Sequence, residues 1–269
     1  MKHITINALH EWSWIFGLYS GFAYGEYLKG NKVFVVSHPN SRPFFYFLDS
    51  IATYSNNEWF KCGIEDIYNK DFNPKSINPN WSPPPYQKYY SKLFKRNHNK
   101  DVIVISNKYN KEWFSKVYNY LSLDFLEKFF KLFSNKFKIY YIRYNGNSKD
   151  NNQEYFDDVT PLPFNDYELT KKYNIETIYD IMNEESIGFN TAQLYIHSKA
   201  KYTVTVAGGN SVLSSFFGDE LIQYNCPDCT STNREIWGSD TWIKNINNVK
   251  IIGSQSHDEI LKITKQRWL

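Results

Sequence analysis

Apolar runs alternate with amphipathic segments along the second half of the chain. Runs of β-branched and aromatic residues predict strands, whereas apolar residues that recur every three or four positions predict helices. From about residue 100 onward the two kinds of segment alternate, which is typical of an α/β fold with a mostly parallel sheet. The predicted strands are residues 101–106, 137–143, 202–206, 220–224 and 249–253, and the predicted helices are residues 122–136, 175–182, 190–200, 211–217 and 257–266.

The first half of the chain has a less regular pattern. Strands are predicted at 3–9 and 32–37, and a helix, or a loop followed by a helix, at 11–28. The apolar run 44–54 has no clear period, and we interpret it as a helix. Residues 73–85 contain five of the chain's 10 prolines, which excludes a central strand or a helix interior. We therefore expect a long loop or an interdomain connection there.

Several predicted helices carry signals at their ends. Asn190 and Gln193 have the spacing of a capping box at the start of helix 190–200. Gly218 follows helix 211–217, where glycine commonly ends a helix. Within 11–28, small residues recur at four-residue intervals, which predicts close packing of a buried helix or glycine loop conformations. These small residues are Ser13, Gly17, Gly21 and Gly25.

Composition and charge exclude several classes of protein. The 31 basic and 28 acidic residues are too balanced to indicate nucleic-acid binding. The apolar run 12–24 is too short for an integral membrane span, and no basic region precedes it as in a signal peptide, so we expect a soluble, cytoplasmic protein. Aromatic residues make up 19% of the chain, which reflects either an AT-rich genome or exposed rings that stack on sugars or bases.

The three cysteines do not form a recognisable framework. Cys226 and Cys229 make a lone CxxC pair, and a zinc site would need two more ligands. Together with Cys62 they are too few for a disulfide-based fold. We interpret them as reduced structural thiols.

The stretch YTVTVAGGNSVLSSFFG, residues 202–218, contains the strongest candidate site. Gly208 and Gly209 follow a strand at its carboxyl end, where ligands of open α/β sheets bind. Glycines let a ligand approach the backbone, and the N-terminus of the next helix favours an anion such as phosphate. Asn210 is expected to cap that helix, and Ser211 belongs to a serine face that can meet a ligand or water. The alternative is a plain tight turn, since the motif is neither GxGxxG nor a P-loop.

The segment FNTAQLYIHSKAKYTVTVAGGNSVLSSFFGDELIQYN resembles the donor-binding half of GT-B-type glycosyltransferases. In that half, a helix carrying Gln or Glu precedes a strand, a GG loop, a short helix and another strand. The segments NKYNKEW (107–113) and IYYIRYN (139–145) are similar to parts of uncharacterised glycosyltransferase-like proteins from bacterial and viral polysaccharide gene sets. The resemblance covers roughly residues 100 to 225.

The resemblance implies two Rossmann-like domains with mostly parallel sheets that face each other across a cleft. Residues 1–98 would form the acceptor-side domain and residues 99–269 the domain that binds a UDP- or GDP-linked sugar. Gly208, Gly209, Asn210 and Ser211 would contact the donor's diphosphate or ribose, together with Gln193 and Arg143. Arg143 lies where similar enzymes place an arginine on the phosphates, a role that a bidentate guanidinium suits.

The same resemblance implies a metal-independent reaction without a further cofactor. A metal-dependent GT-A site would need a DxD motif, and the nearest equivalent is the adjacent pair Asp157 and Asp158. The general base is expected on the acceptor side, at His10 or Glu11 after the first strand, with His38 as a third candidate.

We therefore expect transfer of a sugar to a hydroxyl of a glycan or glycolipid acceptor, in polysaccharide, lipopolysaccharide or viral glycan assembly. The alternative is a non-catalytic carbohydrate-binding protein or an inactive homologue of such enzymes. A methyltransferase fits less well, because the first strand lacks the glycine-rich loop after it. In both cases we expect no nucleic-acid partner and no integral membrane span.

Overall fold

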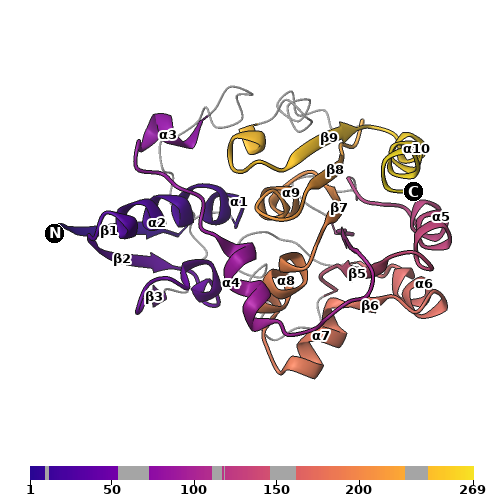
Figure 1. The fold of residues 1–269 in the computed structure, drawn as a ribbon, viewed down its shortest axis with the longest axis horizontal. Helices are drawn as coiled ribbons and strands as arrows, with labels where there is room; N and C mark the ends of the chain where they lie inside the picture. The colour runs from indigo at the N-terminus through magenta and orange to yellow at the C-terminus, as the bar shows by residue number, and fades with distance from the viewer. Residues whose placement is uncertain (10–11, 54–72, 111–116, 118, 146–161, 228–241) are drawn as a thin grey trace.

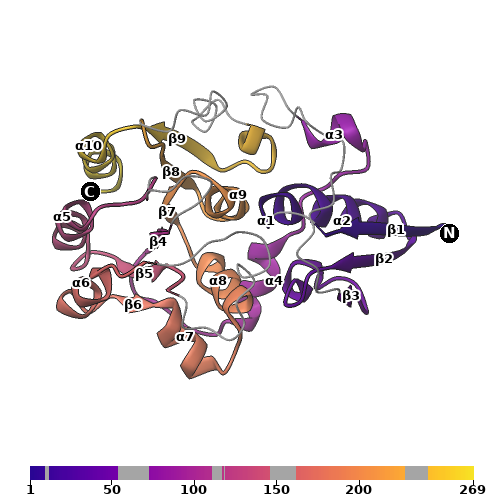
Figure 2. The same ribbon diagram turned by 180° about the vertical axis from the view of Figure 1, so that it is seen from behind.

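A computed structural model describes residues 1–9, 12–53, 73–110, 117, 119–145, 162–227 and 242–269. The chain forms two parallel sheets that lie side by side, with helices between and around them (Figures 1 and 2). The strands are β1 (His3–Ala8), β2 (Lys32–Ser37), β3 (Ala52–Thr53), β4 (Val102–Ser106), β5 (Lys138–Ile142), β6 (Glu176–Thr177), β7 (Tyr202–Val206), β8 (Glu220–Tyr224) and β9 (Lys250–Ser254).

The helices agree with most of the predicted ones and add α3, α4, α6 and η5. They are α1 (Trp12–Trp14), the π-helix η1 (Ile15–Tyr19), α2 (Ser20–Leu28), the 3-10 helix η2 (Arg42–Phe45), α3 (Pro74–Ile77), α4 (Tyr86–Leu93), α5 (Leu123–Phe133), α6 (Asp166–Lys172), α7 (Ile178–Glu185), α8 (Phe189–Ser198), α9 (Gly209–Ser214), the 3-10 helix η5 (Trp242–Asn245) and α10 (His257–Trp268). No helix in the described ranges is both long and apolar enough to cross a membrane.

The smaller sheet contains β1, β2 and β3 in that order, with both strand pairs parallel. The helical predictions failed in one place within this unit. The run 44–54 is not a helix, because η2 ends at Phe45 and the chain returns to the sheet as β3. Phe44 and Phe45 are both fully buried, so packing of consecutive rings determines the local structure here rather than a helical period.

The larger sheet has the order β6-β5-β4-β7-β8-β9, and every pairing is parallel. From β4 the chain moves outward through β5 and β6, and then returns to the other side of β4 with β7, β8 and β9. This is the doubly wound Rossmann order. It confirms the α/β fold with mostly parallel sheets.

Helices cover both faces of the larger sheet. Successive side chains of a strand point to opposite faces, so apolar residues on both faces need helices to pack against them. Ile103 and Ile105 pack with α5 and α10, whereas Val102 and Val104 pack with α7 and α8. All four side chains are buried, so β4 is a central strand with apolar residues on both faces, as the unbroken run DVIVIS predicts.

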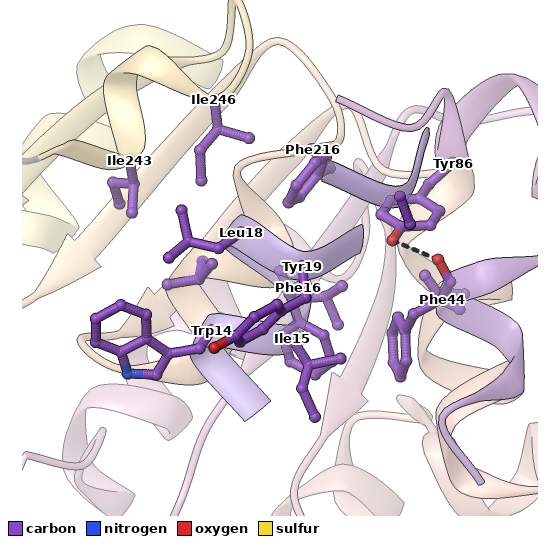
Figure 3. Close-up of a cluster of buried hydrophobic side chains, with 14 of the residues drawn as sticks. Trp14, Ile15, Phe16, Leu18, Tyr19, Phe44, Tyr86, Phe216, Ile243 and Ile246 are labelled. Atoms are coloured by element: carbon purple, nitrogen blue, oxygen red, sulfur yellow. Dashed lines mark hydrogen bonds between the residues drawn. The ribbon is translucent and has the colours of Figure 1, made fainter. Parts of the chain in front are cut away.

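One hydrophobic core joins the two units (Figure 3). It includes Ile15 and Leu18 from η1, Phe44 from η2, and Phe216 and Ile243 from the larger unit. The boundary at residues 98 and 99 stays a prediction. The strands of the two sheets do come from opposite sides of it, although α4, which precedes it, packs against α8 of the larger unit.

The small residues of α2 and η1 form a stripe that receives the proline-rich connection. Trp81 donates its indole N–H to the carbonyl of Gly17 at 3.1 Å, and the backbone N–H of Ser82 donates to Gly21 at 3.1 Å. A Cβ at Gly21 would overlap the Trp81 ring, and one at Gly25 would overlap the backbone oxygen of Asn80. The four-residue spacing therefore reflects close packing of a buried helix, which was one of the two expectations.

Candidate functional site

The carboxyl ends of β4 and β7 form the point where the strand order of the larger sheet reverses. The connection after β4 leads toward β5, and the connection after β7 leads toward β8 on the opposite side. Ligands of open α/β sheets bind in the crevice at such a point. Gly208, Gly209, Asn210 and Ser211, all predicted donor-binding residues, follow β7 here.

Gly208 has a backbone conformation that only glycine adopts readily, with φ +125° and ψ −156°. No heavy atom in the described part of the chain lies within 4 Å of the position that a Cβ would take there. Ser211 supports this conformation, because its hydroxyl donates to the Gly208 carbonyl at 2.8 Å and accepts from the Gly208 N–H at 3.3 Å. The glycine therefore places partly exposed backbone, with open space beside it, at the switch point.

The structure corrects two expectations about α9. Asn210 does not cap the helix, since Gly208 precedes its first turn; the Asn210 amide instead lies 3.5 Å from the carbonyl of Asn107, after β4. The serine face does not meet solvent either. Because α1 and η1 pack against α9, the side chains of Ser211, Ser214 and Ser215 are fully buried. Their hydroxyls donate to backbone carbonyls.

Arg143 follows β5, as predicted, but its guanidinium is already engaged. Its Nε and Nη2 donate to the carboxylate of Asp166, with Nη2 and Oδ1 2.7 Å apart, and only 2% of the side chain is exposed. Tyr167 lies beside it, with its ring centroid 4.9 Å from the guanidinium carbon. Burial opposes the charge, but the hydrogen bond and charge of Asp166 raise the pKa of Arg143 above its usual value. A contact with phosphate stays a prediction, and it would require the guanidinium to turn from Asp166.

Gln193 lies on α8, at the contact between the two units. Its amide donates to Asn190 at 2.8 Å, and the amide of Asn190 donates to the carbonyl of Asn40 at 2.9 Å. The capping box expected from these two residues is wrong, because Gly188 precedes the helix and both lie inside it. A true capping box lies elsewhere, at Thr177 and Asp180 at the start of α7. The donor contact predicted for Gln193 stays a prediction.

The candidates on the acceptor side are mostly outside the described residues. His10 and Glu11 lie outside the described residues, and so do Asp157 and Asp158. The same holds for Cys62 and Cys229. His38 directly follows β2 and is fully buried, with its ring 6.3 Å from that of Trp12. A general base among His10, Glu11 and His38 therefore stays a prediction.

Three residues near the switch point were not singled out from the sequence. Lys108 is half-buried directly after Asn107, at the carboxyl end of β4. Asn107 and Asn119 are buried, and their side chains hydrogen-bond to backbone groups of the surrounding loops. Two signals were available for Asn107 and Lys108: their position immediately after a buried strand, and their place in the segment NKYNKEW (107–113).

Comparisons with known proteins match the fold and not the sequence. No protein-family model matches the chain, and no curated protein matches it significantly. A solved structure of a glycosyl transferase family 9 protein from Veillonella parvula is similar, with a TM-score of 0.50 and 7% identity over 98% of this chain and 88% of that chain. The ADP-heptose lipopolysaccharide heptosyltransferase II of E. coli matches with a TM-score of 0.46 and 10% identity over all of both chains.

At such low identity the likeness extends to the fold alone. The chain thus has an α/β fold with two parallel sheets, as in GT-B-type glycosyltransferases. This agrees with the resemblance noted in the GG-loop segment.

Proposed function

We propose that the protein is a glycosyltransferase that moves a sugar from a UDP- or GDP-linked donor to a hydroxyl of a glycan or glycolipid acceptor. The observation that carries the proposal is the open, glycine-only backbone of Gly208 at the switch point of a doubly wound sheet. The GT-B-like arrangement of two parallel sheets supports it.

The donor's diphosphate would lie against Gly208, at the start of α9. The first turn of a helix carries the positive end of its dipole. In α9 the N–H groups of Ser211 and Val212 donate to the Gly208 carbonyl at 3.0 and 3.2 Å, so the N–H groups proposed to face the diphosphate are those of Gly209 and Asn210. They would stabilise the charge that develops on the leaving diphosphate as its bond to the anomeric carbon breaks. Lys108, half-buried directly after β4 at the switch point, is our candidate for additional positive charge beside the predicted Arg143.

The acceptor hydroxyl would attack the anomeric carbon and lose its proton to a general base. We keep His10 and Glu11 as the candidates, because they directly precede α1, and α1 packs against α9. The chemistry needs one group within hydrogen-bond reach of the acceptor hydroxyl. In this proposal the reaction requires no metal.

A pair of matched glycine variants tests the proposal. Gly208 and Gly30 both have positive φ, +125° and +74°, and among the described residues no heavy atom beyond their chain neighbours lies within 4 Å of an added Cβ. Gly208→Ala and Gly30→Ala therefore both strain the backbone without a steric clash, but Gly30 lies in the turn before β2. The affinity of each folded variant for UDP and GDP would be measured by calorimetry, with and without magnesium.

The proposal predicts that one nucleotide binds the wild type in excess chelator. Gly208→Ala is expected to weaken that binding by about tenfold or more, which corresponds to ~1.4 kcal/mol, whereas Gly30→Ala leaves it unchanged. Equal affinities for the two variants would remove Gly208 from the site. If neither nucleotide binds the wild type, the proposed donor class is wrong.

A further inference from the structure

A network of buried polar groups crosses the carboxyl edge of the larger sheet. Asp166, which holds Arg143, accepts a hydrogen bond from the hydroxyl of Tyr141 at 2.6 Å. The same hydroxyl accepts from the side-chain amide of Asn107 at 3.0 Å. Asn107 in turn pairs with the backbone of Leu121, donating to its carbonyl at 3.1 Å and accepting from its N–H at 2.8 Å. These five residues connect the end of β5 to the end of β4.

Asn119 precedes Leu121 by two residues in the same loop and connects that loop to the ends of β7 and β8. Its amide donates to the carbonyl of Ala207 at 2.8 Å, and its oxygen accepts from the N–H of Cys226 at 3.2 Å. Asn119 has a left-handed backbone, with φ +54°, which asparagine tolerates better than most residues. We call the set Arg143, Asp166, Tyr141, Asn107, Leu121 and Asn119 the carboxyl-edge network.

The network ends at the residue that precedes Gly208. A backbone conformation as rarely populated as that of Gly208 persists only where the surrounding structure holds it. Ser211 holds Gly208 from the α9 side. Asn119 donates to the carbonyl of the preceding residue, Ala207, and buried carbonyls require such a partner.

The hydroxyl of Tyr141 determines the direction of the hydrogen bonds in the network. Burial, together with the Asp166 carboxylate, raises the pKa of Tyr141 well above its ordinary value, so its hydroxyl stays protonated and donates to Asp166. Its oxygen then remains the acceptor for Asn107. The orientation of the Asn107 amide, which pairs with Leu121, is thereby determined.

We propose that the carboxyl-edge network positions the Gly208 loop for the donor's diphosphate, with Tyr141 and Asn119 as positioning residues. The inference rests on the proposed function for its ligand. Both side chains are buried and contact protein groups, so they act through the loop rather than by touching the donor.

Neighbouring tyrosines provide the first matched pair of variants. Tyr141→Phe removes the hydroxyl that joins Asp166 to Asn107. Tyr140→Phe removes a hydroxyl of an equally buried residue on the other face of the sheet, 3.1 Å from His98. Both changes preserve the ring.

Left-handed asparagines provide the second pair. Asn119→Gly removes both loop contacts while glycine keeps the positive φ without strain. Asn174→Gly makes the same change at the same backbone conformation, φ +52°, at an exposed position after α6. It therefore controls for the added freedom of the unfolded chain.

Two measurements follow for each variant. The first is amide hydrogen exchange of the ligand-free protein over residues 203–213, which reports opening of the loop without any nucleotide. The second is the dissociation constant for UDP and GDP. Loss of one buried hydrogen bond of ~1 kcal/mol corresponds to a change of about fivefold.

Tyr141→Phe and Asn119→Gly each remove two hydrogen bonds, so they are expected to speed exchange in this segment by about fivefold or more and to weaken nucleotide binding by about as much. Tyr140→Phe and Asn174→Gly should leave both quantities within about twofold. Equal exchange in the test and control variants would overturn the positioning role. If the wild type binds neither nucleotide, the proposed function fails, and the exchange data still decide whether the network holds the loop.

Discussion

Arg143 and Asp166 form a buried ion pair, and removing one partner is expected to cause a large loss in the free energy of unfolding. Asp166 is fully buried and accepts four hydrogen bonds, two from Arg143, one from Tyr141 and one from the N–H of Tyr167 at 3.0 Å. Arg143→Met would leave a buried carboxylate with two donors. Breaking a buried pair typically costs 3–5 kcal/mol, and the remaining donors favour the lower end, about 3 kcal/mol.

A double-mutant cycle measures this cost. Urea unfolding followed by tryptophan fluorescence would give the free energy of unfolding for Arg143→Met, for Asp166→Leu and for the double variant. Each single variant is expected to lose about 3 kcal/mol or more, and the double variant to recover much of that loss, because no unpaired charge remains. Total stabilities of 5–15 kcal/mol leave room to measure such losses.

Two results would refute this reasoning. A loss below about 1 kcal/mol for Arg143→Met would mean that the pair is solvated in the protein. Unchanged stability together with weaker nucleotide binding would mean that the guanidinium contacts the phosphates, as the sequence resemblance implied, and not Asp166.

Two further predictions concern packing and pH. A change of Gly to Ala in an exposed helix interior stabilises the helix by about 1 kcal/mol. Gly25→Ala is instead expected to lower the free energy of unfolding by about 1–3 kcal/mol, because the new Cβ overlaps the backbone oxygen of Asn80. A higher free energy of unfolding in urea would contradict this packing. Burial lowers the pKa of His197 from 6.5 to about 3, so below pH 6.5 only the unfolded chain binds this proton. This group should therefore lower the free energy of unfolding by about 1.4 kcal/mol for each pH unit as pH decreases from 6.5 toward 3. In urea unfolding at several pH values, His197→Leu should lack this contribution to the pH dependence. An unchanged pH dependence would show that His197 is protonated in the folded state.

Central strands of the larger sheet were the easiest elements to predict. The runs 101–106 and 137–143 have apolar side chains on both faces, and the structure places β4 and β5 within them. The order of the strands was not readable from these segments, because it depends on contacts between residues about one hundred positions apart, such as Ile103 with Tyr202.

The aromatic run after β2 shows where the local pattern failed. Phe44 packs its ring 4.4 Å from that of Phe16, and Tyr86 donates its hydroxyl to the Phe44 carbonyl at 2.9 Å. Tyr46 stacks on Tyr89 at 3.8 Å. These contacts come from η1 and α4, so tertiary packing determines a segment whose own sequence is compatible with a helix.

The site could be predicted only in part for a similar reason. The position of Gly208 after a strand was visible in the sequence, because a strand, a glycine pair and a short helix are contiguous. The partner of Arg143, Asp166, is 23 positions away, and that of Asn119, Ala207, is 88 positions away. The burial of Ser214 depends on α1 and η1 near the other end of the chain.

Nucleotide-dependent hydrogen exchange of the wild-type protein tests the central claim most directly. UDP and GDP would each be added in excess chelator, and the protection of every peptide compared with the free protein. A site at the switch point predicts that one nucleotide slows exchange at residues 106–110 and 206–211, which follow β4 and β7. Protection confined to any other part of the chain, or none with either nucleotide, would contradict the assignment of this loop as the donor site.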